Sequence, residues 1–462
     1  MSVISIIRFC LSISAVVCLS SCSSREIPKP NVILIVADDL GYGDIGCFGS
    51  EKNRTPNLDQ MALEGMRFTN FYSTSGVCTP SRTSIMTGCY AQRLNMHVDE
   101  NSRWVLFPNA RKGLNPEEET IAELLKTKGY ATACIGKWHL GDQPEFLPTR
   151  HGFDYYFGIP YSNDMNRPNI PLPIMRNEKV IEAPVDQVNL TKRYTEEAIK
   201  FIEENKSRPF FIYLPHTFPH LPLYATNQFK GKSKNGRYGD AVEELDWSTG
   251  EIMQKLRKLG IEKNTMIMFT SDNGSYNINA DSNKPFKGKK GDTDEGSMRI
   301  PFIVKYPAYI PRRSSCTAMT STMDLLPTIT GLAGTKRPDK KIDGKDIWNL
   351  MRGKETETPH KVFYYYHTDQ LQAVRYGKWK MMLPQKSKKR GWSGRIENFE
   401  LKLYNLSLDR RESNDVSSDH PEVVLKMYEY AKAAEAELGN NGSKGTGQRP
   451  AGWVQSAKPL KK

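Results

Sequence analysis

The sequence predicts an α/β protein in which helices cover a large, mainly parallel sheet, followed by a smaller C-terminal antiparallel sheet with one helix. Short apolar runs that end abruptly in polar residues predict strands buried on both faces. Helix-like segments between these runs predict a layered arrangement. After about residue 355 the pattern changes to short aromatic segments, which predict the smaller sheet. At 462 residues the chain is long enough for both parts.

Four apolar runs are the strands expected in the large sheet, and helices are expected between them. In parallel sheets ligands gather at the carboxyl ends of the strands, so the polar clusters that follow the runs should share one edge. The expected strands are 32–37, 131–135, 210–214 and 266–270, and the expected helices are 118–127, 195–204 and 239–259.

The C-terminal part is predicted from the segments FYYYHT, AVRYGKWKMML and LKLYNL, which are typical of short strands joined by turns. A helix over 421–438 follows, and the tail from Gly439 is expected to be irregular. The predicted boundaries are a main domain over residues 31–354 and a C-terminal subdomain with its tail over residues 355–462.

The N-terminal segment, residues 1–21, resembles a lipoprotein-type signal peptide, because one Arg precedes an apolar stretch that ends in small residues. Leu19-Ser20-Ser21-Cys22 resembles a bacterial lipobox, which implies cleavage before Cys22 and lipidation of that cysteine. Residues 22–30 would then be a tether. The alternative is a plain signal peptide in which Cys22 is incidental. The expected location is outside the cytoplasm of a bacterium, periplasmic or anchored by lipid to the outer membrane.

Composition excludes several classes of protein. Hydrophobic residues are 38% and charged residues 25%, a globular balance, and the mean hydropathy of −0.57 excludes a polytopic membrane protein. The formal net charge of +13, from 65 basic and 52 acidic residues, favours an anionic partner. The cysteines beyond Cys22 are scattered without CxxC spacing, so neither a disulfide framework nor a zinc site is expected.

Carboxylates follow two of the expected strands. Asp38 and Asp39 end one strand, and Asp272 and Asn273 end another. A single Asp in such a place is usually a turn or cap residue. Carboxylates that converge on one sheet edge repel one another, and a divalent cation removes that cost. An all-oxygen set predicts a hard ion, Ca²⁺ or Mg²⁺.

A short helix is expected to begin near Cys78, since Pro80 fits a first helical turn and Gly88 fits the helix end. Cys78 would lie at the positive N-terminus with Arg82 one turn away, an environment that lowers a thiol pKa and attracts an oxyanion. The alternative is a buried structural cysteine.

Cys78-Thr79-Pro80-Ser81-Arg82, followed by Gly88, resembles the signature of type I sulfatases, which belong to the alkaline phosphatase superfamily. In that family the cysteine is oxidised after translation to Cα-formylglycine. The resemblance covers about residues 31–416 and implies an alkaline phosphatase-like fold and an arylsulfatase-like sulfuric ester hydrolase. The other motifs, in family order, are NVILIVADDLGYGDIGCFG, LNPEEETIAELLKTKGYATACIGKWHLG, PHTFPHLPL, FTSDNG, KGKKGDTDEGSMRIPFIVKYP and LYNLSLDRRESND.

The resemblance implies roles for individual residues. The modified Cys78 is the nucleophile and completes a metal site, with Ca²⁺ expected and Mg²⁺ as the alternative. Arg82 holds the formylglycine hydroxyls, and Lys137 and His139 lie beside the nucleophile. The metal ligands carried over are Asp38, Asp39, Asp272 and Asn273, and the substrate-binding residues are Ser162, His220 and Lys290.

Two of these assignments have competitors nearby. His220 is chosen over His216 because the family histidine precedes x-Pro, as in His220-Leu221-Pro222. Lys290 lies five residues before Glu295, where the family places its sulfate-binding lysine, although Lys287 and Lys289 are close.

The implied reaction is attack on sulfur by one hydroxyl of the hydrated aldehyde. His220 protonates the leaving oxygen, and His139 then deprotonates the second hydroxyl. The expected partners are a sulfated carbohydrate substrate, a formylglycine-generating maturation enzyme and a membrane reached through the lipid anchor. Nucleic acid is not expected for an exported protein.

Two alternatives to a glycan sulfatase remain at this point. One is a phosphodiesterase or phosphonate monoester hydrolase of the same superfamily, since some of these also use formylglycine. The other is a lipid-anchored glycan-binding protein without turnover.

A basic stretch in the C-terminal part allows two interpretations. It runs from Arg375 to Arg395 with eight Lys or Arg and no acid. It is either a solvated loop of the small sheet or a subsite for a sulfated polymer.

Overall fold

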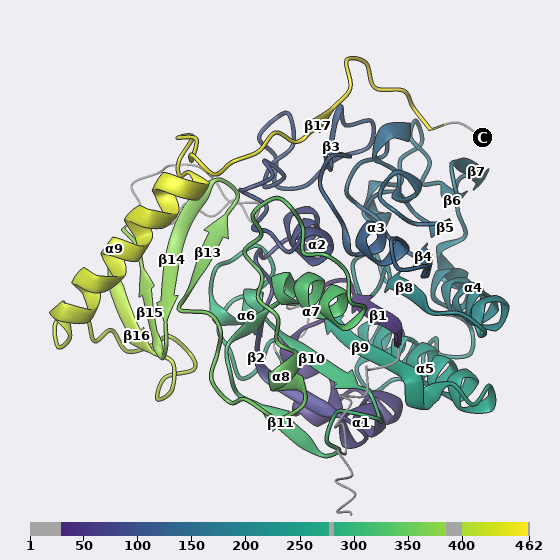
Figure 1. The fold of residues 1–462 in the computed structure, drawn as a ribbon, viewed down its shortest axis with the longest axis horizontal. Coiled ribbons are helices and arrows are strands. Elements are labelled where there is room, and N and C mark those ends of the chain that lie inside the picture. Colours follow the sequence, from purple (N-terminus) through teal and green to yellow (C-terminus); the bar gives the residue numbers. More distant parts are fainter. Residues whose placement is uncertain (1–28, 277–280, 385–399, 461–462) are drawn as a thin grey trace, which may run out of the picture.

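The structure is a computed structural model that describes residues 29–276, 281–384 and 400–460 (Figure 1). Within these residues, eleven strands form one large mixed sheet with the order β11-β2-β10-β9-β1-β8-β4-β5-β6-β7, and β12 pairs with β2. The strands are β1 (Asn31–Ala37), β2 (Met66–Tyr72), β4 (Ala131–Ile135), β5 (Tyr155–Gly158), β6 (Ile174–Arg176), β7 (Lys179–Glu182), β8 (Phe210–Pro215), β9 (Thr265–Ser271), β10 (Arg299–Lys305), β11 (Ser314–Cys316) and β12 (Thr320–Ser321).

Helices cover both faces of this sheet (Figure 1), which confirms the predicted fold class. Helices α2, α3 and α7 pack on one face, and α1, α4 and α5 pack on the other. The helices of this part are α1 (Pro56–Leu63), α2 (Cys78–Thr87), α3 (Ile121–Lys126), α4 (Leu190–Asn205), α5 (Gly236–Lys258), α6 (Glu295–Met298), α7 (Leu325–Leu332) and α8 (Trp348–Met351).

The central strand β1 shows why the apolar runs fold as they do. Val32, Leu34 and Val36 contribute to the core on one face, while Ile33, Ile35 and Ala37 contribute to the core on the other. Because both faces are buried, the strand is apolar without alternation.

The strands that carry the polar clusters run in the same direction. β1 is parallel to β8 and β9, and β4 is parallel to β8 and β5. Their carboxyl ends therefore meet at one edge of the sheet, as predicted.

The C-terminal part forms a second sheet of four antiparallel strands, with α9 (Pro421–Leu438) packed on it (Figure 1). The tail after α9 returns to the large domain, where β17 (Gly452–Trp453) pairs with β3 (Lys112–Gly113). The expected irregular tail therefore contains one short paired segment. The strands of the small sheet are β13 (Val362–His367), β14 (Gln370–Tyr376), β15 (Trp379–Met382) and β16 (Lys402–Asn405).

Several expectations lie outside the described residues. They concern the signal segment with Cys22, and the basic residues from Lys386 to Arg395. Three basic residues of the same stretch are described. Arg375 and Lys380 are buried side chains of β14 and β15, so at these two positions neither a solvated loop nor an open subsite is correct, whereas Lys378 is exposed in the turn between the two strands. Among the described residues, no helix has the length and apolar character needed to cross a membrane.

Candidate active site

The candidate site is built from the carboxyl ends of five neighbouring strands. Asp38 and Asp39 follow β1, Asp272 and Asn273 follow β9, and Lys137 and His139 follow β4. His220 comes after β8, and Ser162 comes after β5. All of these side chains are buried.

Cys78 is the first residue of α2, and the helix ends at Gly88, whose φ of 67° suits glycine. The Sγ atom of Cys78 lies 3.4 Å from Oδ1 of Asp38. Every residue of α2 is buried, and the helix packs against α3, α7 and the short helical turn at Thr322–Asp324. The predicted helix around the sequence motif is therefore confirmed.

Asp38 lies at the centre of a network of opposite charges. The Lys137 ammonium donates to Asp38 Oδ2 at 2.5 Å, and the Arg82 guanidinium lies 3.5 Å from the same oxygen. Arg82 also binds Asp272 at 2.8 Å. Burial alone would raise the pKa of Asp38, but the nearby Lys137, His220, Arg82 and Lys290 hold it well below its usual range. Asp38 is therefore an anion in the folded protein.

Asp39 links the remaining substrate-binding candidates. Its Oδ2 accepts from the Lys290 ammonium at 2.8 Å and lies 3.7 Å from Nε2 of His220. Ser162 Oγ lies 3.4 Å from the same histidine nitrogen and accepts from Lys137 at 3.2 Å. The structure thus brings Ser162, His220 and Lys290 into the cluster with Asp38 and Cys78.

The two histidines that competed in the sequence lie in different surroundings. His220 belongs to the charged cluster, whereas His216 lies in the core, 3.3 Å from Ser248 Oγ. Burial lowers the pKa of His216 to about 3. Burial also lowers the pKa of His220, with Lys290 adding to the effect and Asp39 opposing it. Both rings are therefore neutral near pH 7.

His139 is fixed by its backbone and its ring. Its ring Nε2 lies 2.9 Å from the Leu106 carbonyl oxygen, which assigns the proton to Nε2 and leaves the Nδ1 lone pair available. Its carbonyl oxygen accepts from Thr79 Oγ1, one residue after Cys78. Burial, Lys137 and Arg82 keep the pKa of His139 well below its usual range.

The Cys78 thiol does not have the lowered pKa that its helix position suggested. Burial raises its pKa, and the Asp38 carboxylate adds to the rise, while Lys137 and Lys290 oppose it only in part. The prediction of a lowered thiol pKa is therefore wrong, and the alternative, a buried cysteine, agrees with the structure. The main cause is burial, and Asp38, which reaches the helix N-terminus from a different element, adds to it.

The donor groups suit a hard divalent cation. Asn273 donates through Nδ2 to Asp39 at 2.7 Å, and its Oδ1 is buried without a hydrogen-bond partner among the described residues. Asp38, Asp39, Cys78 and His220 offer ligand atoms that all lie within 4.8 Å of one another. Carboxylate and amide oxygens are the ligands that Ca²⁺ and Mg²⁺ prefer. Asp272 is turned toward Arg82, and its role as a ligand stays a prediction.

A glycine shapes the turn that presents Lys137. Gly136 has a φ of 132°, and a Cβ there would lie 1.9 Å from the Pro215 carbonyl oxygen. The same carbonyl accepts from the Lys137 backbone N–H at 2.8 Å. Only glycine fits this close approach, which orders Lys137 beside Asp38.

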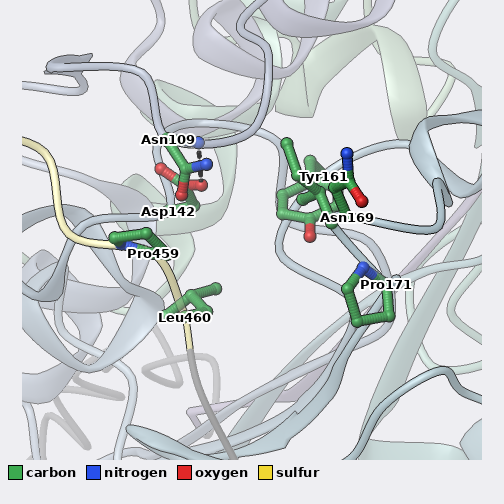
Figure 2. A pocket seen from close by; sticks show the side chains of 8 residues that line it. Asn109, Asp142, Tyr161, Asn169, Pro171, Pro459 and Leu460 are labelled. Atoms are coloured by element: carbon green, nitrogen blue, oxygen red, sulfur yellow. Dashed lines mark hydrogen bonds between the residues drawn. The ribbon is translucent and has the colours of Figure 1, made fainter.

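A cavity of about 90 Å³ lies near the same sheet edge (Figure 2). It opens between Asn109 and Asp142 on one side and Tyr161 and Asn169 on the other, and Leu460 of the C-terminal tail forms part of its wall. Asp142 is three residues after His139, and Tyr161 precedes Ser162. Burial raises the pKa of Asp142 to about 6. Burial and, to a smaller extent, the Asp142 carboxylate raise the pKa of Tyr161 above its usual value of 10.

Neither this cavity nor the partners of Thr79 could be predicted from the sequence. Thr79 accepts from the Leu106 backbone N–H at 3.2 Å and so joins α2 to the loop beside His139. Its position inside the Cys78 motif was the available signal. The cavity combines four separate chain segments, and no local pattern marks it.

Two protein families, two individual proteins and one solved structure are similar to this chain. The family described as Sulfatase matches residues 30–335, and the family described as N-sulphoglucosamine sulphohydrolase, C-terminal, matches residues 290–435. N-acetylgalactosamine-6-sulfatase of Mus musculus is 41% identical, over 77% of this chain and 72% of that protein. Steryl-sulfatase of Homo sapiens is 35% identical, over 76% of this chain and 75% of that protein. A solved structure from work on the metabolism of multiple glycosaminoglycans by Bacteroides thetaiotaomicron has a TM-score of 0.78 at 29% identity, over 88% of this chain and 99% of that chain.

The donor set predicts that Asp39→Asn weakens divalent-ion binding while keeping the shape of the side chain. The affinity of the variant for Ca²⁺ should fall by more than about 10-fold. Changing a residue that only hydrogen-bonds to a metal ligand already costs about 10-fold, and Asp39 is a proposed ligand itself. Calorimetric titration of chelator-treated protein measures this. Asp246→Asn, which changes a buried carboxylate of α5, is the control and should bind Ca²⁺ as the unchanged protein does. Equal affinity in Asp39→Asn would contradict the site.

Proposed function

The chain belongs to the sulfatase family, and from this membership we propose that it removes sulfate from a glycan, with Cys78 as the precursor of its nucleophile. Hydrolysis of sulfate esters is the activity of the family. The observation that carries the proposal is the buried group of Arg82, Lys137 and Lys290 beside Cys78, because it provides fixed positive charge for a sulfate anion.

The charges of the site favour an anionic substrate once a divalent ion is bound. Three carboxylates, Asp38, Asp39 and Asp272, face three cationic side chains, so the protein charges alone nearly cancel. Asp38, Asp39 and Asn273 would hold a divalent cation, which would add positive charge and polarise a sulfate oxygen. Lys290 keeps its proton, since Asp39 and Cys78 raise its pKa against the effect of burial.

Formylglycine, as its hydrate, supplies the hydroxyl that attacks sulfur. An unmodified Cys78 could not take this role, because burial and Asp38 keep its thiol protonated. Arg82 is placed to orient the reacting groups. From one turn further along the same helix as Cys78, its guanidinium contacts Asp38, Asp272 and the Lys137 carbonyl oxygen. We therefore assign Arg82 and Lys137 to orienting the reacting groups.

His220 is the proposed donor to the leaving oxygen. Its Nδ1 lies 2.5 Å from the Leu221 carbonyl oxygen, so Nε2 is the nitrogen directed at Ser162 and Asp39. The ring is neutral near pH 7, and the negative charge of a bound sulfate ester would favour uptake of a proton. His139 is the proposed base, because its Nδ1 has no hydrogen-bond partner among the described residues.

Two similarities support a glycan as the substrate. N-acetylgalactosamine-6-sulfatase and the glycosaminoglycan-related structure are both similar to this chain. The amide, hydroxyl and carboxyl groups in the lining of the cavity near the site suit the hydroxyls of a sugar, and its four apolar residues suit the face of a sugar ring. This mixed lining does not distinguish a glycan from the apolar alcohol that the similarity to steryl-sulfatase suggests, so the choice of a glycan rests on the other two similarities.

We propose Ca²⁺ as the ion, because the site is fully buried and Mg²⁺ usually retains several waters. Conversion of Cys78 requires a maturation enzyme. Export and a lipid anchor at Cys22 remain proposals that rest on the N-terminal sequence.

The first prediction concerns Cys78. In active protein the peptide that contains Cys78 should carry an aldehyde, seen by mass spectrometry and by reaction with a hydrazine probe. Cys78→Ala should release no inorganic sulfate from a sulfate ester, because it has no hydroxyl to attack sulfur. Cys316→Ala, a buried cysteine outside the site, is the control and should retain activity. Full activity in protein whose Cys78 is entirely a thiol would refute the mechanism.

The second prediction separates the two histidines. His220→Ala should lose most activity on sulfated sugars, whose alcohols leave poorly, and less on nitrophenyl sulfate, since general acid catalysis is worth about 10²- to 10⁴-fold where it is needed. His216→Asn should lower both activities equally or not at all. Comparison of kcat/KM for the two substrates tests this, and equal losses in His220→Ala would argue against an acid role.

The third prediction concerns the cavity. Tyr161→Phe and Asp142→Asn should each raise KM for a sulfated oligosaccharide by about 2- to 10-fold, the effect of one lost hydrogen bond of about 1 kcal/mol. Nitrophenyl sulfate should keep its KM, because it does not reach the cavity. Asp164→Asn, an exposed residue of the same segment, serves as control. An unchanged oligosaccharide KM in both variants would rule out the cavity as a sugar site.

A further inference from the structure

The small C-terminal sheet binds the segment that carries Lys290. We call residues 287–295 the Lys290 loop. Four side chains, three from the sheet and one from the turn after it, contact the backbone or a side chain of this loop directly. They are His367 on the Gly291 carbonyl oxygen at 2.9 Å, Lys380 on the Thr293 carbonyl oxygen at 2.8 Å, Gln372 on the Thr293 hydroxyl at 2.8 Å and Glu412 on the Glu295 backbone N–H at 2.8 Å.

Lys380 is the central residue among these contacts. It is completely buried, and its ammonium lies 2.6 Å from Glu412 and 3.4 Å from Glu295, besides its bond to Thr293. A buried ammonium is costly unless it is paired. The partners of Lys380 are either part of the Lys290 loop or bound to it. Glu412 accepts from the Glu295 backbone, and Tyr365, whose ring centroid lies 4.1 Å from the ammonium, bonds to the Glu295 carboxylate. The charge of Lys380 is therefore directed at this loop.

The other side of the loop is attached to the active site. The Lys290 N–H donates to the Ser275 carbonyl oxygen at 2.9 Å, and the Gly291 N–H donates to the Gly76 carbonyl oxygen at 2.9 Å. Gly76 lies two residues before Cys78. The Lys290 ammonium meets Asp39 at 2.8 Å. Because the Lys290 side chain is buried and its ammonium ends on Asp39, a shift of its backbone would lengthen that contact or force the side chain out of its buried conformation.

We infer that Lys380 and Glu412 are positioning residues of the active site: they fix the backbone of residues 291–295 and so hold the Lys290 ammonium opposite Asp39. The small sheet is thereby a working part of the catalytic centre and not only a neighbouring subdomain. This inference rests on the proposed role of Lys290 in binding the sulfate group.

The chain offers a matched control for Lys380. Lys305 of β10 is also buried and also lies between two glutamates, Glu64 and Glu262. It pairs with Ile267 near the start of β9, toward the edge of the sheet opposite the active site. Both lysines carry the cost of a buried charge, but only Lys380 contacts the Lys290 loop among the described residues.

The experiment compares Lys380→Met, Lys305→Met and Lys290→Ala in the full chain with its cysteine converted. Lys380→Met should lower kcat/KM for nitrophenyl sulfate by about 10- to 100-fold, the size of effect that a small misplacement can cause. It should also weaken inhibition by inorganic sulfate. Lys305→Met should lower Tm while leaving kcat/KM and sulfate inhibition unchanged. Thr293→Val, which removes only the hydroxyl that binds Gln372, provides a milder test should Lys380→Met fail to fold, and should lower kcat/KM by about 2- to 10-fold.

A double variant distinguishes positioning from a general loss of stability. Lys290→Ala with Lys380→Met should be no less active than Lys290→Ala alone, because both changes remove the same interaction. Losses that multiply in the double variant, or unchanged sulfate inhibition in folded Lys380→Met, would overturn the inference. Wild-type activity in Lys290→Ala would refute the proposed role of Lys290 itself, and a damaged Lys290→Ala beside a fully active Lys380→Met would refute this inference alone.

Discussion

The ion pair between Asp38 and Lys137 is the contact on which the candidate site depends. Both side chains are fully buried, and their charged atoms lie 2.5 Å apart. Removing either partner would leave an uncompensated charge in the interior, which is far more costly than leaving a surface charge unpaired. The pair is held because the strands before it, β1 and β4, are each parallel to β8. The covered sheet therefore fixes the charges before any substrate arrives.

Because the sheet fixes the positions of these charged groups, part of the site could be predicted from the sequence. Asp38, Asp272 and Lys137 each come within two residues of the end of a mainly apolar run, and the rule that parallel strands end at one edge places them together. The distinction between His216 and His220 came from the resemblance and not from physical reasoning, since both follow β8. Their burial and partners separate them only once the chain is folded.

The residues that escaped prediction act across long sequence separations. Lys380 and Glu412 contact a loop about 90 to 120 residues earlier in the chain. In the sequence, Lys380 lies in a basic stretch that is typical of a solvated surface. The residues around it do not indicate that two buried glutamates, distant in the sequence, pair with it in the fold. The direction of the Cys78 pKa shift was predicted wrongly for the same reason. The helix terminus is a local feature, whereas burial, the main cause of the raised pKa, and the Asp38 carboxylate that adds to it both arise from distant parts of the chain.

Burial of Cys78 also limits when the proposed conversion can take place. Cys78 is 2% exposed, and every residue of α2 is buried. An enzyme that oxidises the thiol needs access to Cys78, which the folded chain does not give. Opening this region would break the Asp38, Arg82 and Asp272 contacts together. Under the proposed function, conversion therefore precedes closure of the sheet, and the charge network that later orients the nucleophile also seals it from further modification.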